Sequence, residues 1–108
     1  MRTFLRQFMA IGAIAGMAGL TALAQSDAKD LYLSKCSVCH GADGAGKTAK
    51  GKKLKALDVR ETSKKVSADE MIKIVQDGKG ANMDAYGKEF SKDQIKALVE
   101  HYRGLAKH

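Results

Sequence analysis

Residues 36 to 40 of this 108-residue chain read Cys36-Ser37-Val38-Cys39-His40, and they contain both of its cysteines. Side chains three positions apart lie on one face of a helix, and the histidine follows directly. Two thiols at this spacing can form thioether bonds to both vinyl groups of one porphyrin, and the imidazole can bind the iron from the same side. The stretch therefore predicts one covalently attached haem c, held through Cys36 and Cys39, with His40 as the proximal ligand.

A pair of cysteines at this spacing has three other uses. A structural zinc ion needs about four ligands, and the further histidines, His101 and His108, are seven positions apart at the far end of the chain. A thioredoxin-like redox pair needs a βαβ pattern, and no strand-like alternation is visible. A disulfide between residues this close encloses a very small loop and stabilises little. Haem attachment is favoured, with disulfide or redox use as the main alternatives.

The first 24 residues have the organisation of a secretory signal peptide. Arg2 and Arg6 give a positive start, residues 8–23 carry no charge, and Ala22-Leu23-Ala24 has the small-x-small pattern of a cleavage site. A membrane-spanning helix needs about 20 apolar residues, and the uncharged run is shorter than this. We expect cleavage of residues 1–24, rather than an uncleaved membrane anchor, and a single periplasmic domain over residues 25–108.

The chain is basic, with 19 Lys and Arg against 12 Asp and Glu and a formal charge of +7. It has no arginine-rich face and no aromatic stacking platform, so nucleic acid is not an expected partner. A basic surface suits docking to acidic redox proteins, and plain solubility is an equally good explanation of it. We expect a monomer with no stable membrane insertion after cleavage.

The residues around the cysteine motif predict a helix that breaks just after it. A first helix is expected from Ala28 to Cys36, and it runs into the motif. The glycine-rich stretch 41–46 then ends it. The lysine-rich stretch 47–55 is typical of a loop with one short helical turn.

Two capping boxes predict the later helices. Ser67-Ala68-Asp69-Glu70 opens a helix that stops at Gly78, and Ser91-Lys92-Asp93-Gln94 opens one that weakens at Gly104. Residues 80–90 form a loop between them. With no credible strand, the fold class is all-α, with about three to four helices and loops wrapped round one haem.

A haem iron bound by one histidine has a second axial position. Met83 stands in the predicted loop among polar residues, where a large apolar side chain needs a reason, and a thioether bond to iron is one. The alternative is loop packing by an adaptable side chain. Met71 has the helical spacing of a core residue, and His101 lies inside the last helix, where a packing or surface role is the commoner one. His108, at the last position of the sequence, and several lysines are the other candidates for the second axial ligand.

Together these motifs resemble a small class I c-type cytochrome. The matching residues are Leu31-Tyr32 and residues 36–41, residues 77–80 and 83–87, and residues 91–99 and 103–106. The resemblance implies a cytochrome c-like fold in which the first and last helices cross and the haem lies between them and the loops. It implies axial ligation by His40 and Met83 and one-electron transfer between iron(III) and iron(II). It also implies that Ala28 and His101 are packing residues at the crossing.

The chain departs from that family pattern at two positions. Asp84 follows Met83 where the family often has proline, which leaves the loop freer and adds a charge. The chain also has no proline between the motif and the middle helix, where a proline carbonyl commonly accepts the N–H of the proximal histidine. A ligating histidine needs such an acceptor, so we expect a backbone carbonyl in residues 49–57 to take this role for His40.

The sequence therefore predicts an electron carrier rather than an enzyme. Nothing resembles the distal acid–base pair of an open-site haem enzyme or gas-binding protein. A haem subunit fixed within a larger oxidoreductase complex remains the alternative, because it would share the same fold. The apolar side chains expected around the haem are Leu54, Leu57, Ile74, Val75 and Leu98. The lysines expected around its exposed edge are Lys47, Lys50, Lys79 and Lys88.

Overall fold

The computed structural model describes residues 27–107. All regular secondary structure in this range is helical and none is strand, which confirms the predicted all-α class. Within the described range, no helix has the length and apolar character needed to cross a membrane. The predicted signal peptide and His108 lie outside the described residues.

The first helix runs without a break from residue 27 to His40. Its middle, η1 (Tyr32–Cys36), is π-helical, because the N–H of Ser37 donates to the carbonyl of Tyr32, five residues earlier. The last turn, α2 (Ser37–His40), carries the cysteine–histidine motif. Gly41 ends the helix with a φ of 81°, a backbone conformation that favours glycine. The predicted break after the motif is confirmed, and the π-helical segment was not predicted.

The short helix α3 (Ala49–Lys53) is the single helical turn expected in the lysine-rich stretch. Thr48 caps it, accepting a hydrogen bond from the N–H of Gly51 at 2.9 Å. The same hydroxyl lies 2.7 Å from the carbonyl oxygen of Val38 and 3.0 Å from that of Cys39. One threonine therefore joins the start of α3 to the end of the first helix.

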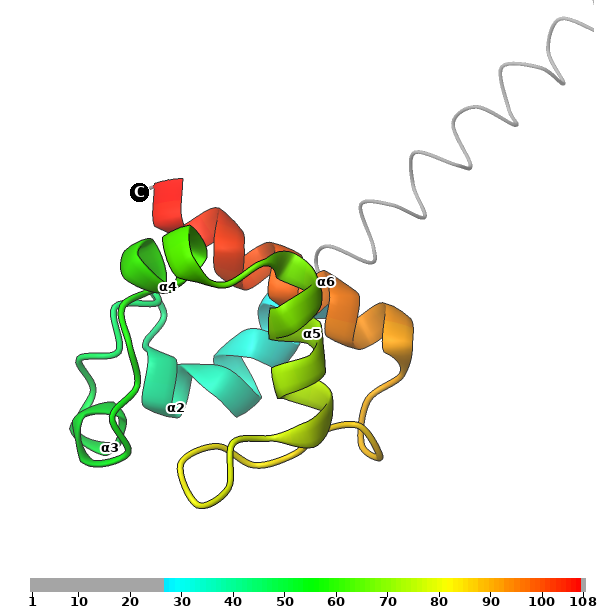
Figure 1. Cartoon of the computed structure of the whole chain (residues 1–108), viewed down its shortest axis with the longest axis horizontal. Coiled ribbons are helices and arrows are strands. Elements are labelled where there is room, and N and C mark those ends of the chain that lie inside the picture. Colours follow the sequence, from blue (N-terminus) through cyan, green and yellow to red (C-terminus); the bar gives the residue numbers. More distant parts are fainter. Residues whose placement is uncertain (1–26, 108) are drawn as a thin grey trace, which may run out of the picture.

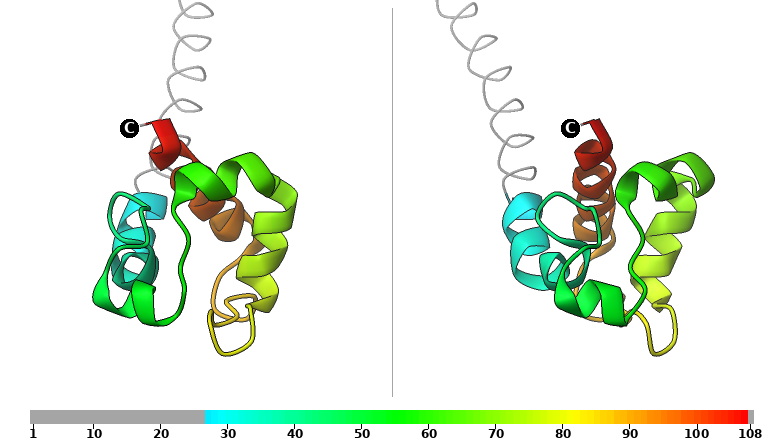
Figure 2. Two further views of the ribbon diagram at one scale, coloured as in Figure 1. Left: turned by 60° about the vertical axis from the view of Figure 1, so that its left-hand side comes forward. Right: turned by 90° about the vertical axis from the view of Figure 1, so that its left-hand side faces the viewer.

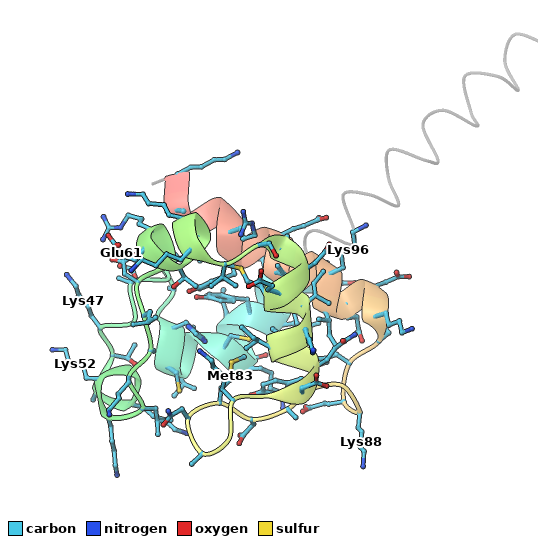
Figure 3. All side chains as sticks on the ribbon, in the orientation of Figure 1. Lys47, Lys52, Glu61, Met83, Lys88 and Lys96 are labelled. Carbon is cyan, nitrogen blue, oxygen red and sulfur yellow. The ribbon has the colours of Figure 1, made fainter. Side chains whose placement is uncertain are left out.

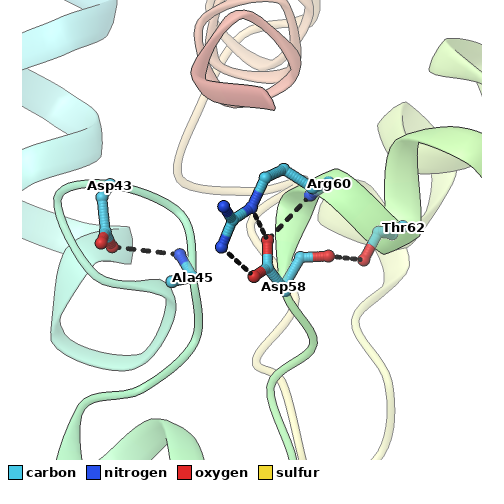
Figure 4. A network of polar contacts seen from close by, with 5 residues as sticks. All are labelled: Asp43, Ala45, Asp58, Arg60 and Thr62. Carbon is cyan, nitrogen blue, oxygen red and sulfur yellow. Dashed lines mark hydrogen bonds and ion pairs between the residues drawn. The ribbon is translucent and has the colours of Figure 1, made fainter. Parts of the chain in front are cut away.

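The helix α4 (Val59–Lys65) was not predicted. Asp58 caps it, accepting from the backbone N–H of Arg60 at 2.9 Å and from its guanidinium at 2.7 Å (Figure 4). The carbonyl of Asp58 also accepts from the Thr62 hydroxyl at 3.0 Å. A helix with one buried apolar residue, Val59, shows no apolar periodicity that would predict it.

Helices α5 (Ala68–Asp77) and α6 (Lys92–Gly104) begin at the predicted serines. Ser91 forms a complete capping box with Gln94, because each side chain bonds the backbone N–H of the other. Ser67 makes one half of such a box, accepting from the N–H of Glu70 at 3.2 Å. The chain then continues from α6 into a short 3₁₀-helix, η2 (Leu105–Lys107).

The first helix and α5 lie on opposite sides of α6, as both views of Figure 2 show. Helix α5 packs against α6, and α4 packs against α6 and η2 (Figure 1). Apolar side chains from the first helix, the loop before α6 and α6 itself form the central cluster. Its buried members are Tyr32, Phe90, Ile95 and Leu98.

Tyr32 is the centre of the contact between the first and last helices. Its side chain is 1% exposed, and its hydroxyl donates to the carbonyl of Gly41 at 2.6 Å. The ring centroids of Tyr32 and His101 are 5.0 Å apart, so the packing role expected for His101 is confirmed. Ala28, expected as the small residue at this crossing, is 3% exposed.

Candidate functional site

A cleft with a volume of about 260 Å³ lies between the first helix, α3 and the following loop on one side and α5 with residues 78–90 on the other. It brings together donor groups from segments more than forty residues apart. Its lining includes Cys36, Cys39 and His40 from the motif and Met83 from the loop after α5. The four residues that the sequence singled out therefore share one cavity.

The two cysteines are half-buried free thiols on the wall of this cleft. Burial, and then the neighbouring Cys39, raise the pKa of Cys36 to about 11. A redox-active thiol pair needs a lowered pKa, because the thiolate is the reacting form, so this environment disfavours the thioredoxin-like alternative. The zinc alternative needs a cluster of ligands, and residues 27–107 hold no group of three or more His, Cys, Asp and Glu side chains placed to bind a metal ion.

His40 ends α2 and presents its imidazole to the cleft. Burial lowers the pKa of His40, which favours the neutral imidazole that binds metals. Its ring meets the ring of Tyr102 edge-on, with centroids 5.3 Å apart. The Nδ1 atom is buried and has no hydrogen-bond partner in the described part of the chain, so the carbonyl acceptor expected in residues 49–57 is absent from the structure.

Met83 is half-buried in the loop that follows α5. Figure 3 shows it directed toward the space between α2 and α5. Its carbonyl accepts from the N–H of Lys79 at 2.8 Å, which closes the loop. Gly78 makes this possible, because its φ is 77° and a Cβ there would lie 2.8 Å from the Met83 carbonyl oxygen. The loop backbone is thus set by glycine, and the methionine side chain faces the cleft.

The remaining wall of the cleft is largely apolar. All five apolar side chains expected around a haem line it: Leu54, Leu57, Ile74, Val75 and Leu98. Sequence reasoning missed Thr62 and Tyr102, which line the cleft as well, and Met71, whose predicted core position is confirmed by its 5% exposure, lines it too. Thr62 was missed because α4 was not predicted. Tyr102 and Met71 have helical spacing, which predicts a core position but does not distinguish the core from the wall of a cleft.

Lysines border the cleft, although not all of those expected. Lys50 and Lys79 line it, and Lys35 and Lys55 stand there as well. Lys47 and Lys88 do not line it, and Figure 3 shows both pointing away from the molecule. The prediction for these two was wrong, because a lysine's place in a loop does not reveal on which side of the loop its side chain leaves.

The donor set fits a haem. Two thiols on one helical turn, an imidazole with its Nδ1 buried and a thioether from the facing loop surround an apolar cavity. An all-α domain built round such a cavity defines a small c-type cytochrome, a class that carries covalently bound haem c. The family model described as cytochrome c oxidase, cbb3-type, subunit III, matches residues 23–101, and the chain belongs to this family.

A solved structure is also similar to this chain. It is described as the KustC0563 c-type cytochrome, with 32% sequence identity and a TM-score of 0.67. The similarity covers 71% of this chain and 94% of that one. No curated protein matches the chain. Both similarities indicate a role in electron transfer, which is the general function of c-type cytochromes.

Proposed function

We propose that the chain is a periplasmic one-electron carrier with a single haem c. Cys36 and Cys39 would hold the haem through thioethers, and His40 and Met83 would be its axial ligands. One observation carries the proposal, namely that these four side chains line the same apolar cleft. The haem iron, when bound, supplies a couple between iron(III) and iron(II).

The residues around the cleft would suit the iron(III)/iron(II) couple to electron transfer. Ligands from both sides, His40 and Met83, would leave no position for a substrate, so no ligand has to enter or leave during electron transfer. Methionine is a soft neutral ligand and favours the reduced state, which raises the reduction potential. Apolar walls such as Ile74 and Leu98 exclude water from the cleft and act in the same direction.

The lysines at the cleft supply the docking surface. Lys35, Lys50, Lys55 and Lys79 line the opening, and Asp84 is the single acidic side chain among the lining residues. An opening with this charge would attract acidic redox proteins and orient them toward the haem edge. The signal peptide expected in residues 1–24 supports a periplasmic location.

A second candidate is a haem subunit held within a larger complex. It is favoured by the family description, which names a subunit of an oxidase. Gel filtration of a native periplasmic and membrane extract discriminates between the two. A free carrier is found in the periplasmic extract and elutes at the size of the single chain. A subunit is found in the membrane extract and elutes as part of a large assembly.

Met83→Ala tests the axial ligation. The variant should bind carbon monoxide, change from low spin to high spin and have a lower reduction potential, because the soft ligand is lost. Met71→Leu is the matched control, since Met71 lines the same cleft, and it should keep the low-spin spectrum. An unchanged low-spin spectrum in Met83→Ala would exclude Met83 as the ligand.

A further inference from the structure

Two methionines, not one, line the cleft. Met83 comes from the loop after α5, and Met71 comes from the first turn of α5 itself. Each carries a thioether with the same chemistry toward iron. Since α5 and the loop after it place both thioethers in the lining of the same cavity, the question is which of them is available as a ligand.

Arg103 distinguishes the two sulfur atoms. Its Nη1 lies 3.7 Å from the Sδ of Met71 with hydrogen-bond geometry, and it donates to the carbonyl of Val66 at 2.9 Å. Val66 immediately precedes the cap of α5, so one guanidinium ties α6 to the start of α5 and to the Met71 sulfur. A charged donor makes a stronger hydrogen bond than a neutral one, and arginine does not lose its charge in proteins.

Met71 is therefore held in place in three ways. It is 5% exposed, it belongs to a helix whose first turn is capped by Ser67, and its sulfur lone pair faces the Arg103 N–H. Met83, by contrast, is fixed through its backbone carbonyl by Lys79, and no hydrogen bond reaches its sulfur from residues 27–107. The lone pairs of Met83 remain available to a metal.

We propose that Arg103 is a specificity-determining residue that keeps the Met71 thioether from the iron and so reserves the sixth position for Met83. The proposal rests on the proposed haem ligation. It predicts that removal of the guanidinium frees the Met71 sulfur, which would then compete for the iron wherever Met83 is missing. A single charged hydrogen bond of this kind shifts such a competition by about tenfold.

The experiment compares three purified holoproteins. They are Met83→Ala, Met83→Ala with Arg103→Leu, and the triple variant that also carries Met71→Leu. Spin state is measured by electron paramagnetic resonance, and thioether ligation is measured by NMR of ¹³C-methyl-labelled methionine. The single variant should be high spin. The double variant should regain a low-spin form with one shifted methionine methyl signal, and its ratio of thioether-bound to unbound iron should be about tenfold higher than in the single variant. The triple variant should lose this low-spin form.

Two results would overturn the proposal while leaving the haem carrier intact. One is a double variant that remains as high spin as Met83→Ala. The other is a Met83→Ala single variant in which Met71 already binds the iron. If Met83→Ala keeps the wild-type methyl signal and spectrum, the proposed ligation by Met83 fails instead. Arg103→Gln, which keeps an N–H donor for Val66, replaces Arg103→Leu if the leucine variant does not take up haem.

Discussion

At the scale of single residues, the cysteine motif depends on a neighbouring glycine, Gly51. Gly51 is buried in α3, directly against the end of the first helix. A Cβ at this position would collide with the carbonyl oxygen of Cys39 and would lie 2.8 Å from that of Gly46. These obstacles are backbone atoms, so they can move only if α3 separates from the motif.

Gly51→Ala should destabilise the holoprotein by about 1–3 kcal/mol, the range for overpacking, and should lower the yield of covalent haem. Thermal unfolding and the haem absorbance per chain measure the two effects. Gly104→Ala is the matched control, because Gly104 is helical and a Cβ there would have no atom within 4 Å. It should stabilise by about 0.5–1 kcal/mol. Equal melting temperatures for the two variants would contradict the argument.

Tyr32→Phe isolates the buried hydroxyl at the helix crossing. The change leaves the ring packed against His101 and removes only the 2.6 Å hydrogen bond to the Gly41 carbonyl. The Gly41 carbonyl keeps a second hydrogen bond, from the N–H of Gly44 at 3.1 Å, so urea unfolding should report the loss of one ordinary hydrogen bond, about 0.5–1.5 kcal/mol. Tyr86→Phe, a half-buried tyrosine stacked on Phe90, is the control and should change stability much less.

At the scale of elements, α4 begins with an ion pair that is sensitive to acid. The hydrogen bonds from the Arg60 side chain and backbone N–H lower the pKa of Asp58 to about 2. A carboxyl group whose pKa is lower in the folded state stabilises the fold above its unfolded pKa, and the stabilisation disappears as the pH falls toward the folded pKa. The relevant window therefore lies between about pH 4 and pH 2.

Asp58→Asn should reduce the dependence of the melting temperature on pH within this window. Asparagine still caps a helix, so the variant separates the loss of charge from the loss of the cap. The measurement is a series of thermal unfolding curves of the holoprotein between pH 2 and pH 5. The same slope in variant and wild type would show that Asp58 does not contribute to acid sensitivity.

Some helices could be predicted from the sequence alone, and others could not. The starts of α5 and α6 were predictable because a serine cap is local chemistry that tertiary packing does not override. Helix α4 was missed because its stability depends on packing against α6 and η2 rather than on an apolar pattern of its own. The π-helical turn was missed because it differs from an α-helix by one hydrogen-bond step, which leaves no signal in composition.

Some features of the candidate site could likewise be predicted from the sequence, and others could not. The two cysteines and His40 were singled out by residue type and spacing, and Met83 by its place in a polar loop. The structure places all four in one cleft, and their binding of haem stays a prediction. Three of the apolar wall residues, Ile74, Val75 and Leu98, lie on the two helices that the capping boxes predicted. The environment of His40 Nδ1 and the contact of Arg103 with Met71 were not predictable, since both depend on distances between segments that the sequence leaves undefined.

At the scale of the whole molecule, residues 27–107 form a small core. The buried apolar residues are Ala28, Tyr32, Val59, Met71, Phe90, Ile95, Leu98 and Val99. A large share of the other apolar side chains faces the cleft instead, including Leu57, which is 62% exposed. A domain of this size is marginal by burial alone, so an apolar macrocycle in the cleft would complete its core.

The protein with Cys36→Ala and Cys39→Ala, freed of haem, should therefore be largely unfolded. Far-ultraviolet circular dichroism and a thermal scan measure the residual helix and its cooperativity. Wild-type holoprotein is the reference, and acid–acetone extraction should remove haem from the variant but not from the wild type. A cooperative, native-like melt of the haem-free chain would show that the core is sufficient without the haem.

The π-helical segment Tyr32–Cys36 has a consequence for what changes this helix can tolerate. Its widened turn amounts to one residue inserted into an α-helix, and each residue of an α-helix turns the chain by about 100°. The π-helical turn absorbs that extra residue, so the α-helical turns before and after it keep one common phase. Deletion of a single residue here would convert the segment to α-helix and leave the motif facing the cleft, whereas insertion of a further residue would turn the motif by about 100° relative to the start of the helix.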